Sequence, residues 1–172
     1  NEQAVRYPYY LAADIVPELD RLSGCGVKVV ILFSGDTGFY SGCGKLYETL
    51  KGRSDSSVRI YPGISSVSYL AALTGYSYQD AAVLSIHGHG ADSEWIGNLT
   101  ETIRFSAKTF LLMSGKEDVQ KLGRLLQNYH LQNCTVLAGF QLSYPQEKVL
   151  TLTPEACEHV EETGLYICLI LN

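Results

Sequence analysis

Two patterns of apolar residues occur in the first half of the chain, one with helical spacing and one nearly continuous. Apolar side chains recur at helical spacing in residues 13–23. Residues 27–33, VKVVILF, are apolar almost throughout, which is typical of a strand buried on both faces of a parallel sheet. The first half is therefore predicted to contain, in order, helix 13–23, strand 27–33, helix 39–52, strand 57–62 and helix 65–75. This alternation indicates βαβ units.

The pattern changes near residue 80, and we predict a domain boundary there, with one α/β domain in 1–79 and another in 80–172. Residues 91–107 are mixed and predicted to be helical in part. Thr153 is expected to cap a helix that has Pro154 at its first position. The other elements predicted after the boundary are strands in AVLSIHGHG, KTFLLMSG, NCTVLAGFQL, EKVLTLT and GLYICLIL and an amphipathic helix in KEDVQKLGRLLQNYH.

Composition narrows the class of protein. The 172 residues carry a net charge of −5 and scattered basic residues, which argues against a nucleic-acid partner. The five cysteines show no C-x-x-C spacing, so neither a disulfide framework nor a metal site is expected, and the thiols fit a reducing cytoplasm. The first residues do not resemble a signal peptide, and no apolar stretch reaches the roughly 20 residues that a membrane helix needs.

Two motifs follow predicted strands of one βαβ unit. SGDTGFYSG, residues 34–42, has glycines that permit a sharp turn and a carboxylate, Asp36, that suits a ligand hydroxyl or ammonium group. YPGISSVS, residues 61–68, places two hydroxyls at a helix N-terminus, where free N–H groups suit a carboxylate. Ordinary turns and caps use the same residues. Because ligands bind beyond the carboxyl ends of strands in open α/β sheets, their joint presence favours a site.

These motifs resemble those of a known family. SGDTGFYSG is similar to the Gly-Asp-Pro turn of the tetrapyrrole methyltransferases, and YPGISSVSYLAALTG to their Pro-Gly-Ile-Ser-Ser motif and following helix. SIHGHG and LAGFQLSYPQEKVLTLT resemble segments of one branch, the precorrin-6Y C5,15-methyltransferases, in particular their C5-methylating module. The resemblance extends from about residue 27 to the end of the chain. It implies two α/β domains, the first with a parallel sheet and the second with a mixed sheet.

The same resemblance implies a cofactor and a set of contacts. S-adenosylmethionine would bind in a folded conformation in the cleft between the two domains of the chain. The protein would form a homodimer. The residues expected to contact it are Gly35, Asp36, Gly38, Tyr40, Ser65, Ser66, Met113, Ala138 and Thr153. Met113 and a loop at Ala138-Gly139 would do so through their backbones, and Thr153 would close the site.

Four departures from the family pattern stand out. No strand with a Gly-x-Gly-Pro-Gly loop precedes Ala13, so the opening strand, loop and helix are expected to be missing. Thr37 stands where proline is usual, which should leave the turn less rigid. His89 replaces an arginine, and Phe140-Gln141 replaces a glutamate-arginine pair, which weakens a charge-based hold on substrate carboxylates.

The expected reaction is methylation of a ring carbon of a precorrin or cobalt-precorrin in cobalamin biosynthesis, at C5 with C15 as an option. A separate subunit would supply the second methylation and a decarboxylation. His87 and His89 are the candidate catalytic residues, either as proton acceptors or as partners of a substrate propionate, and a structural role remains the alternative. The alternatives in function are a methylase of siroheme precursors or ribosomal RNA, and an inactive domain that only binds cofactor or dimerises.

Overall fold

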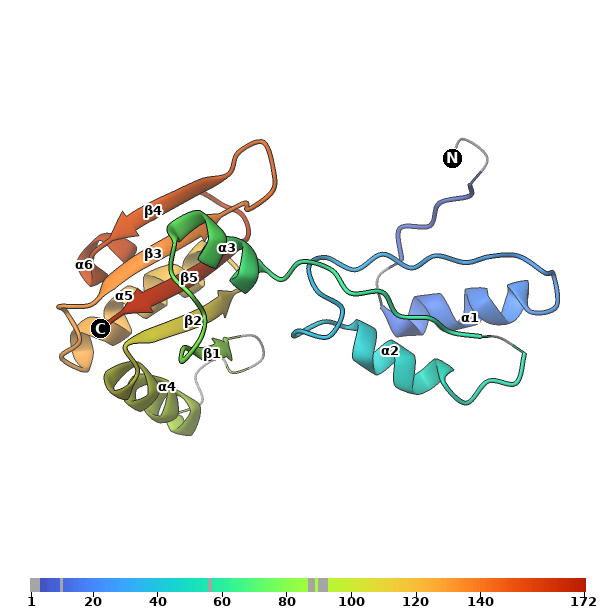
Figure 1. Ribbon diagram of the computed structural model, residues 1–172, viewed down its shortest axis with the longest axis horizontal. Helices are drawn as coiled ribbons and strands as arrows, with labels where there is room; N and C mark the ends of the chain where they lie inside the picture. Colours follow the sequence, from blue (N-terminus) through green and yellow to red (C-terminus); the bar gives the residue numbers. More distant parts are fainter. Residues whose placement is uncertain (1–3, 10, 56, 87–88, 90–92) are drawn as a thin grey trace. The chain divides into compact units, whose positions relative to one another are not determined.

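The protein consists of two compact units, and each is described by itself. The computed structural model describes residues 4–9, 11–55, 57–86, 89 and 93–172. Unit 1 is Asn1–Ser65 and unit 2 is Ser66–Asn172 (Figure 1). The division therefore falls before the helix at 66–74, whereas the sequence analysis placed that helix in the first domain. The helix joins unit 2 because its buried Leu70 packs against Gly139.

Unit 2 is built on a five-stranded mixed sheet with the order β1-β2-β5-β3-β4. The strands are β1 (Ala82–Ser85), β2 (Lys108–Met113), β3 (Thr135–Phe140), β4 (Lys148–Leu152) and β5 (Tyr166–Leu171). β1 and β2 pair in parallel, and the other neighbouring strands pair antiparallel. The mixed sheet and all five strands of this half agree with the sequence prediction.

Helices complete unit 2 and supply its core. They are α3 (Ser66–Thr74), α4 (Ser93–Phe105), α5 (Lys116–Asn128) and α6 (Pro154–Cys157). The apolar stripe predicted on α5 is buried at Val119, Leu122 and Leu126, against β2, β3 and β5. The predicted cap of α6 is confirmed, because the hydroxyl of Thr153 accepts a hydrogen bond from the backbone N–H of Ala156 at 3.1 Å.

Unit 1 contains two helices, α1 (Ala12–Leu22) and α2 (Cys43–Leu50). Their buried residues Ile15, Leu46 and Leu50 form a small core. Ile31 and Phe33 of the predicted first strand pack against this core, whereas Leu32 between them is 88 % exposed. The run therefore has the period-two alternation of a strand, with one face covered by helices and one face open.

The two predicted strands of unit 1 are not formed as strands. Within the described residues 4–9, 11–55 and 57–65, the chain at 27–33 and 57–62 carries no ladder pairing. The prediction of a parallel sheet in this half is therefore wrong for the residues described. The cause is physical, because an apolar run becomes a strand only where a neighbouring backbone pairs with it, and both runs leave large apolar side chains exposed.

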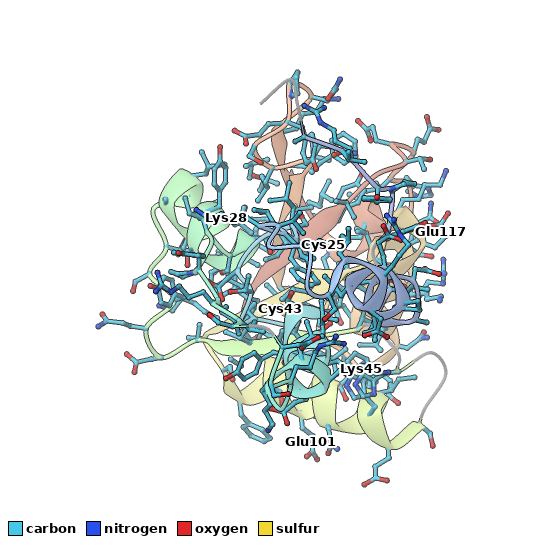
Figure 2. The ribbon with its side chains drawn as sticks, turned by 90° about the vertical axis from the view of Figure 1, so that its right-hand side faces the viewer. Cys25, Lys28, Cys43, Lys45, Glu101 and Glu117 are labelled. Carbon is cyan, nitrogen blue, oxygen red and sulfur yellow. The ribbon has the colours of Figure 1, made fainter. Side chains whose placement is uncertain are left out.

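Three further observations bear on the class of protein. None of the helices in the described part of the chain is long and apolar enough to cross a bilayer. All five cysteines are free thiols. Figure 2 labels two of them in unit 1, Cys25, which is exposed, and Cys43 on α2, which is buried.

Candidate functional site

The first motif forms a tight turn held by its own carboxylate. Gly35 has φ +73°, in the left-handed region that glycine adopts without strain. One carboxylate oxygen of Asp36 accepts a hydrogen bond from the Gly38 backbone N–H at 2.8 Å. The other accepts from the Gly63 backbone N–H at 3.2 Å. Asp36 thus joins the two motifs predicted from the sequence.

Gly63 packs directly on this turn. A Cβ atom built on Gly63 would lie 2.2 Å from the carbonyl oxygen of Gly35 and 3.1 Å from its carbonyl carbon. Both are backbone atoms that cannot move aside cheaply, so only glycine fits at position 63. The two bends predicted to share a site are therefore neighbours in the folded chain.

Thr37 adds a second tie between the motifs. Its hydroxyl donates a hydrogen bond to the backbone carbonyl of Tyr61 at 3.0 Å. Proline, the usual residue of the family at this position, has no hydroxyl to make this bond. The rigidity that the sequence analysis expected to be lost with the ring is thus partly replaced by a cross-link between the two turns.

Tyr40 ends the first motif in a strained and open position. Its φ of +48° is unusual for a residue other than glycine, and its side chain is 58 % exposed. The ring meets Phe39 edge to face, with the ring centroids 5.0 Å apart. An exposed aromatic ring beside a glycine turn offers a flat apolar surface to a ligand.

The second motif ends at the start of α3. Ser66 is the first residue of α3, and Ser65 precedes it, as the predicted helix start required. Both residues are half-buried. The first turn of any helix leaves backbone N–H groups without intrahelical partners, which suits a carboxylate.

One edge of the sheet in unit 2 gathers the ends of three strands. Met113 of β2 and Phe140 of β3 both pair with Tyr166, and Ser85 of β1 pairs with Leu112. The carboxyl ends of β1, β2 and β3 therefore lie along the same edge, which we call the carboxyl edge. Figure 1 shows β1 and β2 pointing to the same side of this sheet. Ligands of open α/β sheets bind beyond such an edge.

Helix α3 begins at the carboxyl edge. Its second turn contacts this edge, because Leu70 touches Gly139 and Tyr69 is hydrogen-bonded to Glu147, next to the first residue of β4. Beyond its end, the backbone carbonyl of Ser77 accepts a hydrogen bond from Lys108, at the start of β2 and thus at the opposite edge. The helix runs away from the carboxyl edge, so its N-terminus at Ser66 lies near Met113 and Phe140.

His89 follows β1 at this edge and stacks on Trp95 of α4. The two ring centroids are 4.9 Å apart and the rings are nearly parallel, at 6°. His89 is exposed, whereas Trp95 is half-buried and packs against the core. One face of the imidazole is thus stacked on the indole ring. His87, the other candidate, lies outside the described residues.

Two of the predicted cofactor contacts are placed differently from expectation. Ala138 and Gly139 do not form a loop, because they lie within β3 and pair with both β4 and β5. Thr153 follows Leu152, which pairs with Val136, four residues before Phe140 or about 13 Å along the strand. Thr153 therefore lies at the edge opposite Met113, and the structure does not bring the two together. Its hydroxyl serves as the cap of α6 instead.

The three buried cysteines of unit 2 provide no nucleophile. Burial raises the pKa of Cys157 to about 12 and the pKa of Cys168 well above its ordinary value. Burial also raises the pKa of Cys134. A thiol is nucleophilic or metal-binding as a thiolate, so these three groups are inert at neutral pH. Within the described ranges, no group of three His, Cys, Asp or Glu side chains is placed to hold a metal ion.

The structure adds residues that the sequence analysis missed. In unit 1, the hydroxyl of Thr37 joins the two motif turns. In unit 2, the ring of Trp95 supports His89, and the Tyr69–Glu147 pair joins α3 to the loop before β4. Glu147 lies far along the chain from Tyr69, so no local spacing signals the pair. Trp95 could have been singled out from the sequence, because it is the single tryptophan of the chain and follows His89 by only six residues.

Comparison with a family profile gives a match over most of the chain. Residues 12–156 match the profile of the Tetrapyrrole (Corrin/Porphyrin) Methylases. A sequence comparison with curated proteins finds no significant match.

Solved structures of methylases share the fold. The methyltransferase CobJ has a TM-score of 0.76 at 16 % identity, covering 99 % of this chain and 78 % of that chain. Uroporphyrin-III C-methyltransferase from Thermus thermophilus, complexed with S-adenosylhomocysteine, has a TM-score of 0.69 at 20 % identity, covering 93 % of this chain and 73 % of that one. Precorrin-6Y methylase from Archaeoglobus fulgidus has a TM-score of 0.66 at 16 % identity, covering 100 % of this chain and 76 % of that one.

Proposed function

Because the chain belongs to the tetrapyrrole (corrin/porphyrin) methylase family, we propose that it methylates a ring carbon of a precorrin or cobalt-precorrin in cobalamin biosynthesis. The position would be C5, with C15 as the further option. The class of enzyme, an S-adenosylmethionine-dependent methyltransferase, follows from the family. The choice of a precorrin-6Y substrate rests on the SIHGHG and LAGFQLSYPQEKVLTLT segments.

The observation that carries the proposal is the packing of Gly63 on Gly35. It joins the two motifs, because Gly63 lies against the Gly35 backbone and donates a hydrogen bond to the Asp36 carboxylate. The residues present fit the cofactor. Gly35 and Gly38 permit close approach, the exposed ring of Tyr40 offers a face to an adenine or a sulfonium group, and the N-terminus of α3 suits the methionine carboxylate.

The chain's own contribution to the reaction is orientation. When bound, S-adenosylmethionine supplies a methyl group already activated by the positive sulfur. Gly35, Asp36, Gly38 and Tyr40 would hold the nucleoside, and Ser65, Ser66 and Met113 would complete the contacts. Aligning two reactants in this way is worth roughly 7–11 kcal/mol. His89, stacked on Trp95, would accept a proton or contact a substrate carboxylate.

A second candidate is methylation of a siroheme precursor. It is favoured by the uroporphyrin-III methyltransferase structure, whose TM-score of 0.69 exceeds the 0.66 of the precorrin-6Y methylase. We also propose a homodimer, a separate subunit for the second methylation and decarboxylation, and no nucleic-acid partner. An inactive domain that only binds cofactor remains the contrasting hypothesis.

Methyl transfer tests the proposal directly. The chain is titrated with S-adenosylhomocysteine by calorimetry and then assayed with methyl-labelled cofactor. Precorrin-6Y and uroporphyrinogen III serve as the two acceptors. We expect cofactor binding and label in precorrin-6Y. Label in uroporphyrinogen III alone would establish the second candidate function. Cofactor binding without methyl transfer would establish the inactive domain. Absence of both binding and transfer would overturn the proposal that the chain is an enzyme.

A further inference from the structure

The loop at residues 141–147, between β3 and β4, contains unusual backbone. Gln141 has φ +47° and Ser143 has φ +68°, although neither is glycine. Two such conformations within three residues cost conformational energy that the surroundings must offset. Strain of this kind persists where a segment has to present a group in one particular place, so the contacts that maintain the loop are informative.

Backbone hydrogen bonds fix both ends of the loop. The N–H of Gln141 donates to the carbonyl of Leu165 at 3.0 Å. The N–H groups of Tyr144 and Glu147 donate to the carbonyls of Gln141 and Tyr144, each at 3.0 Å. The last two bonds form two successive turns, and the first ties the start of the loop to the residue before β5.

Glu147 holds the loop in place through its carboxylate. One oxygen accepts a hydrogen bond from the Ser143 N–H at 2.6 Å, across the loop. The carboxylate also accepts from the Tyr69 hydroxyl of α3, and this hydrogen bond is the largest cause that raises the pKa of Tyr69. Both side chains are half-buried, so the interaction is only partly screened by water. The same carboxylate therefore links the strained loop to the helix that begins with Ser66.

The loop lies at the carboxyl edge and displays one large ring. Lys148, directly after the loop, pairs with Phe140, whose other neighbour in the ladder is Tyr166. Tyr144 is 50 % exposed at the tip of the loop. An exposed tyrosine ring on a rigid support offers area to a flat molecule at little cost in conformational entropy.

We propose that Glu147 is a positioning residue that fixes the loop 141–147 on α3, so that Tyr144 contacts the flat face of the tetrapyrrole. The inference rests on the proposed function, because it needs a tetrapyrrole acceptor at the carboxyl edge. It assigns substrate affinity to Tyr69 and Glu147, which are not among the residues proposed to contact the cofactor. Loss of the Tyr69–Glu147 bond would release the loop while leaving Tyr144 in the chain.

Three variants test the assignment. Tyr69→Phe removes only the hydroxyl, Glu147→Gln weakens the double acceptor, and Tyr144→Ala removes the ring. We expect each variant to raise the acceptor KM about tenfold. Tyr69→Phe and Glu147→Gln weaken a hydrogen bond to a charged group, and Tyr144→Ala removes the contact of the ring with the acceptor. We expect little change in kcat or in the Kd for S-adenosylhomocysteine. Hydrogen exchange of the amides in 142–147 should accelerate in the first two variants.

Tyr129→Phe is the matched control. Tyr129 lies at the end of α5, which starts after β2 and leads away from the carboxyl edge, and it is similarly exposed at 41 %. Binding of uroporphyrin III, followed by quenching of the single Trp95, measures acceptor affinity without turnover. A wild-type chain that transfers no methyl group overturns the proposed function. A Tyr69→Phe variant that binds uroporphyrin III like the control, or a wild type that does not bind it, overturns this inference.

Discussion

Two apolar runs of the chain show how differently similar sequences can end. KTFLLM in unit 2 becomes β2, paired on both sides, with Phe110 and Leu111 completely buried. VKVVILF in unit 1 is more apolar, yet it has no ladder partner among the described residues, and Leu32 is 88 % exposed. The comparison shows that apolar composition favours burial of a segment but does not by itself make it a strand. A strand also needs a neighbouring backbone with which its N–H and C=O groups pair.

The same contrast appears in how each unit is held together. Unit 2 has a large continuous core that includes the buried face of α5 and residues of β2, β3 and β5. The small core of unit 1 rests on Ile15, Leu46 and Leu50. Its motif turns are stabilised instead by polar ties, from Asp36 to Gly63 and from Thr37 to Tyr61. The candidate turn therefore depends on individual hydrogen bonds, and the sheet depends on packing.

The largest effect is expected from a core leucine in unit 2. Leu111→Ala removes a side chain with no exposed surface and should lower the free energy of unfolding by about 3 kcal/mol. Leu32→Ala, the matched change on the exposed run, should alter it by less than about 0.5 kcal/mol. Urea unfolding, monitored by hydrogen exchange in each unit, measures the change in the free energy of unfolding for both variants. A cost for Leu32→Ala as large as that for Leu111→Ala would remove the contrast between the runs.

The next effect is expected at the turn. Gly63→Ala forces a Cβ to within 2.2 Å of the Gly35 carbonyl oxygen and should destabilise unit 1 by about 2 kcal/mol. Calorimetry should also show at least a roughly tenfold weaker binding of S-adenosylhomocysteine, since the turn cannot close. Gly52→Ala is the control, because a Cβ there meets nothing within 4 Å. If Gly63→Ala binds S-adenosylhomocysteine as tightly as the wild type, the turn does not contribute to cofactor binding.

A smaller effect is expected from the tie at position 37. Thr37→Val keeps the shape of the side chain and removes the hydrogen bond to the Tyr61 carbonyl, at a cost of about 1 kcal/mol. Exchange of the amides in 34–42 should accelerate, while exchange in β2 and β3 stays the same. Equal acceleration in both units would show that they unfold as one, contrary to the division drawn here.

The smallest effect is confined to alkaline pH and to unit 2. Burial raises the pKa of Tyr166 to about 12, whereas the phenol of an unfolded chain titrates near 10. The folded state therefore favours the protonated phenol, and the stability it contributes is complete below pH 10 and is lost as pH rises toward about 12. Tyr166→Phe should reduce the slope of stability against pH in this window. The same slope in both proteins would contradict the assignment.

Much of unit 2 was predictable because its signals are local. The stripe of α5 and the apolar runs of β2, β3 and β5 each carry their own periodicity. Thr153-Pro154 likewise identified the start of α6, and Gly75, at φ +72°, the end of α3. What remained hidden was long-range, above all the absence of pairing along 27–33 and the packing of α3 on the second unit.

The site was predictable in part for the same reason. The glycines and Asp36 were recognised from the residue types that a tight turn requires, and the structure places the two motifs against each other. Thr153 was misplaced because its position depends on the register of β4, which no local pattern reveals. The Tyr69–Glu147 pair escaped notice because its members become neighbours only in the folded chain.

The place of β5 in the sheet has a consequence for how the protein is made. Residues 166–171 are synthesised after the other four strands, yet they lie between β2 and β3 and bridge the two halves of the ladder. Until they leave the ribosome, β1-β2 and β3-β4 are separate hairpin-sized pieces with open edges, which are marginally stable and prone to join other chains. The sheet therefore cannot be completed before β5 has left the ribosome, and the nascent chain needs protection until then.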